Sequence, residues 1–210
     1  MLLLCYNTPE AVIYMLEMIK GCRVDDPSIL FEGYERTDSG FAANVNADKI
    51  QSLFEGFVKL HNEDCFVILE VPTNASEEFQ AEFDGTFHND VFYLDGLTPE
   101  RAIAFLNAYG EWLINDGIST FGIGIHSGGN EMLLDKYNVV TVYTKNKQKY
   151  HGFFEKYGIN QVPQLMTAWD YFTEYTPGDS FAYTYKGMNI YGLVEHLKQY
   201  GLYFAKRTEQ

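Results

Sequence analysis

The sequence predicts an α+β protein: a mixed β-sheet with helices packed on one or both faces. Two segments, Thr8-Pro9-Glu10 and Thr98-Pro99-Glu100, each supply a helix N-cap, a proline at the first helical position and an acid in the first turn. Residues 65–71 (CFVILEV) and 139–143 (VVTVY) have the apolar, β-branched composition of strands. A hydrophobic content of 46% supplies enough apolar side chains for a folded core.

Helices are expected where apolar residues recur at helical spacing and where a stop signal follows. Gly21, Gly158 and Gly201 follow three of these segments, as expected of a glycine that ends a helix in the left-handed conformation. The expected helices are residues 9–20, 47–58, 99–115, 146–157, 168–175 and 189–200.

Strands are expected between these helices. The run at 65–71 is nearly all apolar and is predicted to be central in the sheet and covered on both faces. The segments 28–36 and 86–94 are more mixed and are predicted to be edge strands. The remaining expected strands are residues 139–143, 181–185 and 202–205.

The length of 210 residues favours one domain, 1–210, with 150–163 as the place where a sub-boundary would fall. The start MLLLCYNTPE has no basic segment before its short apolar run and is interpreted as a first strand instead of a signal peptide. The three cysteines, Cys5, Cys22 and Cys65, are an odd number without CxxC spacing, so buried reduced thiols are expected. The predicted location is therefore cytoplasmic.

The chain is strongly acidic, with a formal net charge of −14 and an isoelectric point of about 4.6. Residues 1–105 hold 19 acidic and 6 basic residues, a net of −13, whereas 106–210 hold 10 and 9. This balance argues against nucleic acid as a partner, because phosphate binding requires cationic side chains. No apolar run approaches the roughly 18 residues that span a bilayer, so no membrane partner is predicted.

Residues 119–131 (STFGIGIHSGGNE) form the segment with the strongest indication of chemistry. Read as a strand, it places Gly122, Gly124 and His126 on one nearly bare face, which a ligand or another backbone could approach closely. The residues that follow form a flexible turn with exposed amides, namely Ser127, Gly128, Gly129 and Asn130. The alternative is a close-packed strand that enters a hairpin turn.

Known catalytic templates do not fit this segment. The dinucleotide fingerprint, the Walker A loop and the nucleophile elbow all fail at required positions. A hydrolase or transferase activity remains an alternative. In it His126 would be the general base, with Ser127 and Glu131 beside it, and the amides of residues 128–129 would donate hydrogen bonds to an anion. No metal site is predicted, because His61 and Cys65 lack further ligands, and no cofactor is predicted.

Aromatic residues are abundant and concentrate between residues 169 and 191. Trp169, Tyr171 and Tyr175 alternate there with acids and turn residues. Tyrosine and tryptophan combine apolar area with a polar atom and are frequent in protein interfaces. We therefore expect these three residues to belong to a recognition surface.

The function that the sequence favours is a non-enzymatic, acidic module that binds a basic protein. Bacterial immunity proteins that neutralise basic toxins have this profile, a likeness of type without a shared residue motif. Two alternatives remain: the small-molecule hydrolase or transferase at 126–131, and a structural subunit whose segment 169–191 forms a homodimer.

Overall fold

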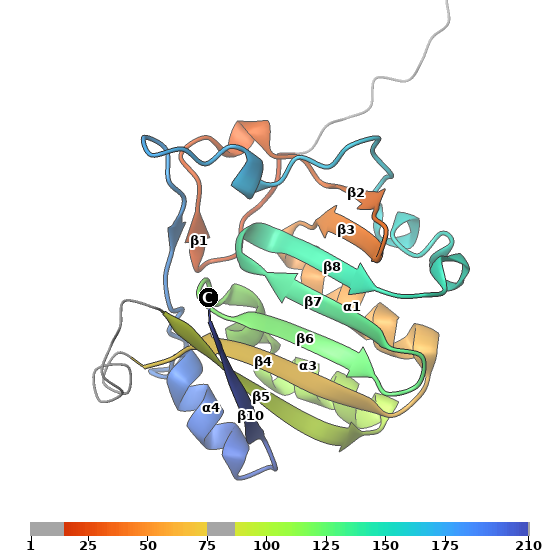
Figure 1. Cartoon of the computed structure of the whole chain (residues 1–210), viewed down its shortest axis with the longest axis vertical. Coiled ribbons are helices and arrows are strands. Elements are labelled where there is room, and N and C mark those ends of the chain that lie inside the picture. Colours follow the sequence, from red (N-terminus) through yellow and green to blue (C-terminus); the bar gives the residue numbers. More distant parts are fainter. Residues whose placement is uncertain (1–14, 75–86, 210) are drawn as a thin grey trace, which may run out of the picture.

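A computed structural model describes residues 15–74 and 87–209 (Figure 1). Its helices are α1 (Ala47–His61), α3 (Pro99–Asn115) and α4 (Ile190–Lys198), with short 3₁₀ turns between several elements. The strands are β1 (Cys22–Arg23), β2 (Gly33–Arg36), β3 (Gly40–Asn44), β4 (Cys65–Pro72), β5 (His88–Leu97), β6 (Thr120–Ile125), β7 (Asn130–Asp135), β8 (Val139–Tyr143), β9 (Asp179–Ser180) and β10 (Tyr203–Glu209).

Eight of these strands form one large sheet in the order β10-β5-β4-β6-β7-β8-β3-β2, and each neighbouring pair runs antiparallel. The strands β6, β7 and β8 follow one another directly as a meander at its centre. The short strands β1 and β9 pair separately. The predicted α+β class is confirmed.

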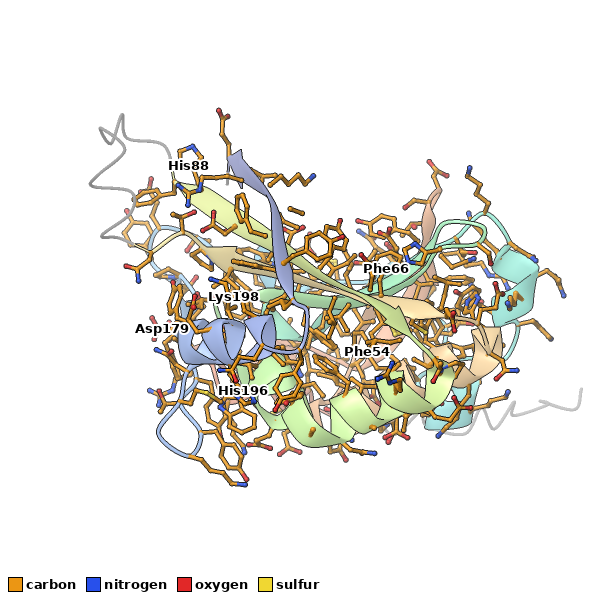
Figure 2. All side chains as sticks on the ribbon, turned by 90° about the horizontal axis from the view of Figure 1, so that it is seen from below. Phe54, Phe66, His88, Asp179, His196 and Lys198 are labelled. Carbon is orange, nitrogen blue, oxygen red and sulfur yellow. The ribbon has the colours of Figure 1, made fainter. Side chains whose placement is uncertain are left out.

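The helices lie on one face of the large sheet. In Figure 2 they lie below it, and Phe54 of α1 points into the layer between helices and strands, while Phe66 of β4 lies on the other side. Side chains alternate along each strand, so that Val67, Leu69 and Phe121 enter the main core with α1 and α3. Burial of such apolar area is the dominant favourable contribution to folding, at roughly 25 cal/mol per Å².

Several predicted elements are confirmed. Helix α3 begins after Thr98, whose side chain accepts a hydrogen bond from the amide of Arg101, and it ends at Asp116, its C-cap. Helix α4 begins after Asn189, whose side chain accepts from the Gly192 amide. The strands at 65–72 and 139–143 form as expected, and 65–72 lies in the sheet interior.

Some helix predictions were wrong. Described residues 15–21 are not helical, since the amide of Leu16 donates to the carbonyl of Leu30 in a bridged extended segment. The aromatic segment 146–157 forms two short 3₁₀ turns, and the predicted helix 168–175 stops at Asp170, although its capping box is present. The earlier residues of the first expected helix, Cys5 and most of the loop 72–85 lie outside the described residues.

The strand predictions also needed correction. Residues 86–94 are not an edge strand, because β10 covers the outer side of β5. In 28–36 only Gly33–Arg36 is strand, and in 181–185 no strand forms, the adjacent Asp179–Ser180 pairing with β1 instead. The strand at 65–72 is covered by helices on one face only, which leaves its other side chains on an uncovered surface.

A fully buried asparagine fastens the N-terminal described segment to the sheet. The Oδ1 atom of Asn138 accepts from the Ile19 amide at 2.9 Å, and its Nδ2 donates to the carbonyls of Glu17 and Val45 at 2.8 Å each. Its φ of 64° is a left-handed conformation that asparagine tolerates better than most residues. One side chain thus satisfies three backbone groups that would otherwise be buried without partners.

The Asn138→Ala variant should be destabilised by about 3 kcal/mol or more, because it leaves these three backbone groups without partners. Chemical denaturation with urea measures this change. The exposed Asn146→Ala is the matched control and should change stability by less than about 0.5 kcal/mol. Equal stability of the two variants would show that the Asn138 side chain does not fasten the segment.

Candidate functional site on the uncovered sheet face

The sheet face opposite the helices carries the candidate site, which we call the open face. Figure 1 looks onto it, with β4, β5 and β6 in front of α3. Its centre is a small apolar strip, in which Phe66, Ile68 and Val91 are buried and Tyr93 and Leu133 pack against them. The open face includes Phe66, Ile68, Glu70, Asn89, Val91, Tyr93, Asp95, Thr120, Gly122, Gly124, Glu131, Leu133, Asp135, Thr141, Tyr143, Tyr203, Lys206 and Thr208.

The two glycines of β6 are covered by the protein's own side chains. A Cβ placed on Gly124 would lie 2.2 Å from the ring of Phe66, and one on Gly122 would lie 2.2 Å from Cδ2 of Leu133. Other groups therefore do approach the backbone of Gly122 and Gly124 closely, as expected from the sequence. The approaching groups are Phe66 and Leu133, so the space above Gly122 and Gly124 is filled.

Four carboxylates surround the apolar strip: Glu70, Asp95, Glu131 and Asp135. Burial raises the pKa of Glu70, Lys206 on β10 opposes that change, and Asp135 reinforces it. The pKa of Tyr93 is raised by burial and then by Glu131, Glu70 and Asp95. The negative potential of this face is thus felt by a tyrosine at its centre.

His126 stands at one end of the open face. Its ring packs on Phe66, with 4.6 Å between ring centroids, and its Nε2 lies 3.4 Å from Oδ1 of Asp95. Its side chain is 61% exposed. Ser127 donates its hydroxyl hydrogen bond to Glu63 instead of to His126. Among the described residues no hydrogen bond joins Ser127 to His126, the pairing that an activated serine requires.

The glycines after Ser127 serve the hairpin between β6 and β7. Gly128 and Gly129 have φ values of 76° and 60°, left-handed conformations that glycine adopts without strain, and they close the four-residue loop 126–129 between the paired Ile125 and Asn130. Asn130, predicted to bind, is buried: its Oδ1 accepts from the Thr144 hydroxyl at 2.7 Å, and its Nδ2 donates to the Ser127 carbonyl at 3.4 Å. Asn130 therefore fixes the turn.

A buried histidine, His61, is linked to Asn130 through Tyr150 and Thr144. His61 Nε2 is 2.8 Å from the Tyr150 hydroxyl, and its Nδ1 is 3.0 Å from Nζ of Lys149. Burial lowers the pKa of His61 to about 4, and Lys149 contributes to the decrease. Burial raises the pKa of Tyr150, and a hydrogen bond with Thr144 opposes that rise. The Thr144 hydroxyl also donates a hydrogen bond to Asn130. His61 is therefore a neutral structural residue.

Cavities of about 90 to 410 Å³ among the described residues include four that residues 122–131 do not line. One of about 300 Å³ lies at the other end of the open face, between Glu70, Thr120, Asp135 and Trp169. Tyr171 lines a cavity of about 90 Å³ elsewhere, and Tyr175 is 91% exposed and lines none of the four. The structure thus brings Trp169 to the acidic face, apart from Tyr171 and Tyr175.

Sequence reasoning missed Glu70, Asp95, Asp135 and Phe66. A signal for Glu70 was present, since it is the one charge in the apolar run CFVILEV. The neighbours of that charge, however, depend on the pairing of β4 with β5 and β6. The sequence does not specify that pairing.

Metal chemistry receives no support in the described ranges 15–74 and 87–209, where no group of three His, Cys, Asp or Glu side chains could hold an ion. Burial raises the pKa of the thiols of Cys22 and Cys65 to about 11, against thiolate chemistry at neutral pH. No helix of the described residues has the length and apolar character needed to cross a bilayer.

Comparison with known proteins identifies no relative: no family model, curated protein or solved structure matches this chain. The chemistry of the open face is therefore inferred from its own residues.

The Gly124→Ala variant should be destabilised by about 1 to 3 kcal/mol, because its methyl group would collide with the ring of Phe66. Thermal and urea denaturation measure this change. In the Phe66→Leu background the same substitution should cost clearly less, since the colliding ring is absent. Equal costs in the two backgrounds would contradict the packing of Phe66 on Gly124.

Stability should depend on His61 in mildly acid solution. Its pKa in the folded protein lies below its ordinary value of about 6.5, so the unfolded chain binds more protons between these values. The contribution is complete above about pH 6.5 and is lost as the pH falls toward 4, by about 2 to 3 kcal/mol.

Urea denaturation at a series of pH values checks this dependence. The His61→Gln variant should lose this part of the pH dependence. The matched control His151→Gln, at an exposed histidine, should retain it. A wild-type profile with no difference from His61→Gln would contradict the account of His61.

Proposed function

We propose that this chain is a non-enzymatic acidic binding protein that captures a basic protein on the open face, in the manner of a bacterial toxin-neutralising immunity protein. The observation that carries the proposal is the uncovered face itself: an apolar strip surrounded by the carboxylates of Glu70, Asp95, Glu131 and Asp135. Attraction between opposite charges would speed the capture of a basic partner. Added salt would screen this attraction and weaken the binding.

Aromatic side chains at the rim supply anchors for such a complex. Tyr143, Tyr203 and Trp169 are large and between 41% and 50% exposed. Such residues bury much area at little entropic cost and are frequent among the residues that dominate binding energy. The Tyr203 hydroxyl donates to Asp95 at 2.6 Å, which fixes one of these anchors beside a carboxylate.

The geometry favours binding over catalysis at residues 126–131. A hydrolase or transferase would need His126 beside its nucleophile and a recess for the substrate. Ser127 instead contacts Glu63, and the space above Gly122 and Gly124 is filled by the side chains of Leu133 and Phe66.

A cytoplasmic location is part of the proposal. It rests on the free, buried thiols of Cys22 and Cys65, which suit a reducing compartment. Homodimerisation through 169–191 stays a prediction, supported by the exposed Trp169, Tyr175 and Phe181, and a mass measurement at several concentrations tests it.

The test is capture of partner proteins from the source cell's extract on immobilised chain, at about 0.05 M and about 0.5 M salt. The expected result is a basic protein retained at low salt and released at high salt. The Asp95→Asn/Glu131→Gln variant should bind the purified partner about 3- to 10-fold more weakly at low salt, because two attractive charges are lost.

The matched control is Asp48→Asn/Glu195→Gln, which removes the same charge from exposed positions on α1 and α4. It should bind within about 2-fold of the wild type. A partner retained equally at both salt concentrations, or equal weakening by both variants, would contradict the proposal. Turnover of a metabolite that is abolished by His126→Gln would establish the enzymatic alternative.

A further inference from the structure

We propose that the cavity between Glu70, Asp135 and Trp169 receives one arginine side chain of the partner. This inference rests on the proposed function and identifies the chemical group that the open face recognises. The cavity has a volume of about 300 Å³ and is lined by Glu70, Asn89, Ile118, Thr120, Asp135, Lys136 and Trp169.

Glu70 is the first observation in support. It lies on β4 in the sheet interior, and only part of its surface reaches solvent. Among the described residues no hydrogen bond or ion pair reaches its carboxylate. Lys206 and Asp135 act on it only through their fields. A partly desolvated carboxylate without a donor is costly, and a cation that enters the cavity would offset that cost.

Asp135 is the second carboxylate, and local contacts hold it in place. Its Oδ1 accepts from the Thr120 hydroxyl at 3.2 Å and from the Lys136 amide at 2.8 Å. These bonds occupy Oδ1, and no hydrogen bond to Oδ2 is found among the described residues. Glu70 and Asp135 could therefore bind one guanidinium group from two sides.

Trp169 provides an aromatic wall that the fold holds rigid. Its ring packs edge-on against Tyr137, at 5.1 Å between centroids, and against Phe172, at 5.5 Å. The capping box of Thr167 and Asp170 fixes the turn that carries it. Half of the tryptophan is nevertheless exposed. A rigid, accessible indole beside two carboxylates favours a cation over its face.

The shape and charge favour arginine over other ligands. The cavity is too small for a folded element but large enough for a guanidinium group and part of its stem. Arginine is planar, offers five donors and stacks on aromatic rings, whereas lysine is a strongly hydrated point charge. Lys136 also lines the cavity and opposes the entry of any cation, so the two carboxylates and the indole ring must outweigh this repulsion.

The experiment uses N-acetyl-arginine amide as the probe and follows the two tryptophan indole N–H signals by NMR. Trp112 is an internal reference, because its Nε1 already donates within the protein to the carbonyls of Tyr185 and Met188. We expect the Trp169 signal to shift and saturate with a dissociation constant of about 1 mM or somewhat weaker, as suits one side chain. The lysine analogue should bind more weakly, and the uncharged citrulline analogue should not saturate.

Two variants and a matched control assign the site. Glu70→Gln and Asp135→Asn should each weaken the probe about 5-fold or more, whereas Glu131→Gln, on the same face outside the cavity, should change it less than 2-fold. If the Glu70→Gln variant does not fold, the effect of Asp135→Asn on probe binding alone tests the site. Absence of a saturable shift, or equal shifts with the citrulline analogue, would overturn the inference.

The two proposals can fail separately. If the probe binds as expected but no basic protein is captured in a salt-dependent way, the proposed function fails and the arginine site stands. If a basic partner is captured through Asp95 and Glu131 but binds Glu70→Gln as tightly as wild type, the arginine site fails and the proposed function stands.

Discussion

The covering of the large sheet on one face only is the constraint from which the rest of the molecule follows. Antiparallel sheets can face solvent on one side, and here α1, α3 and α4 bury the other side. The long central strand β4 therefore has two different surroundings. Val67 and Leu69 enter the main core, whereas Phe66 and Ile68 must be shielded by side chains of the sheet itself.

That shielding explains the composition of β6. Gly122 and Gly124 leave room for Leu133 and Phe66 to lie flat over the strand, which closes a small apolar strip without a second layer of helices. The strip remains narrow, and Glu70, Asp95, Glu131 and Asp135 lie around it, together with Lys206. The proposed binding of a basic protein rests on this combination of a narrow apolar strip and surrounding carboxylates.

Local sequence signals made much of the secondary structure predictable. Strand pairing and side-chain packing could not be predicted from these signals. Thr98-Pro99-Glu100 and Asn189 specify helix starts within a few residues, and the fold confirms α3 and α4. Residues 15–21 have helical spacing, yet Asn138, more than 100 residues away, binds their backbone in an extended form. A contact between residues so far apart in the sequence cannot be predicted from a local residue pattern.

The candidate site was likewise predictable only in part, because local features can be read from the sequence and contacts between strands cannot. The close approach over Gly122 and Gly124 was predictable from their alternation, whereas the identity of the covering groups was not, because Phe66 reaches them from another strand. Trp169 was predicted to bind on composition alone. Its position beside Glu70 and Asp135 depends on the tertiary placement of the segment after Thr167.

The central claim is that the open face, and not the helix-covered side, contacts the partner. Carboxylate footprinting of the chain, alone and with its captured partner, tests this claim most directly. Glu131, Asp135 and Asp95 should lose reactivity in the complex, while Asp48, Glu100 and Glu195 on the helices should keep it. Protection of the helix carboxylates with unchanged labelling of the open face would contradict the account.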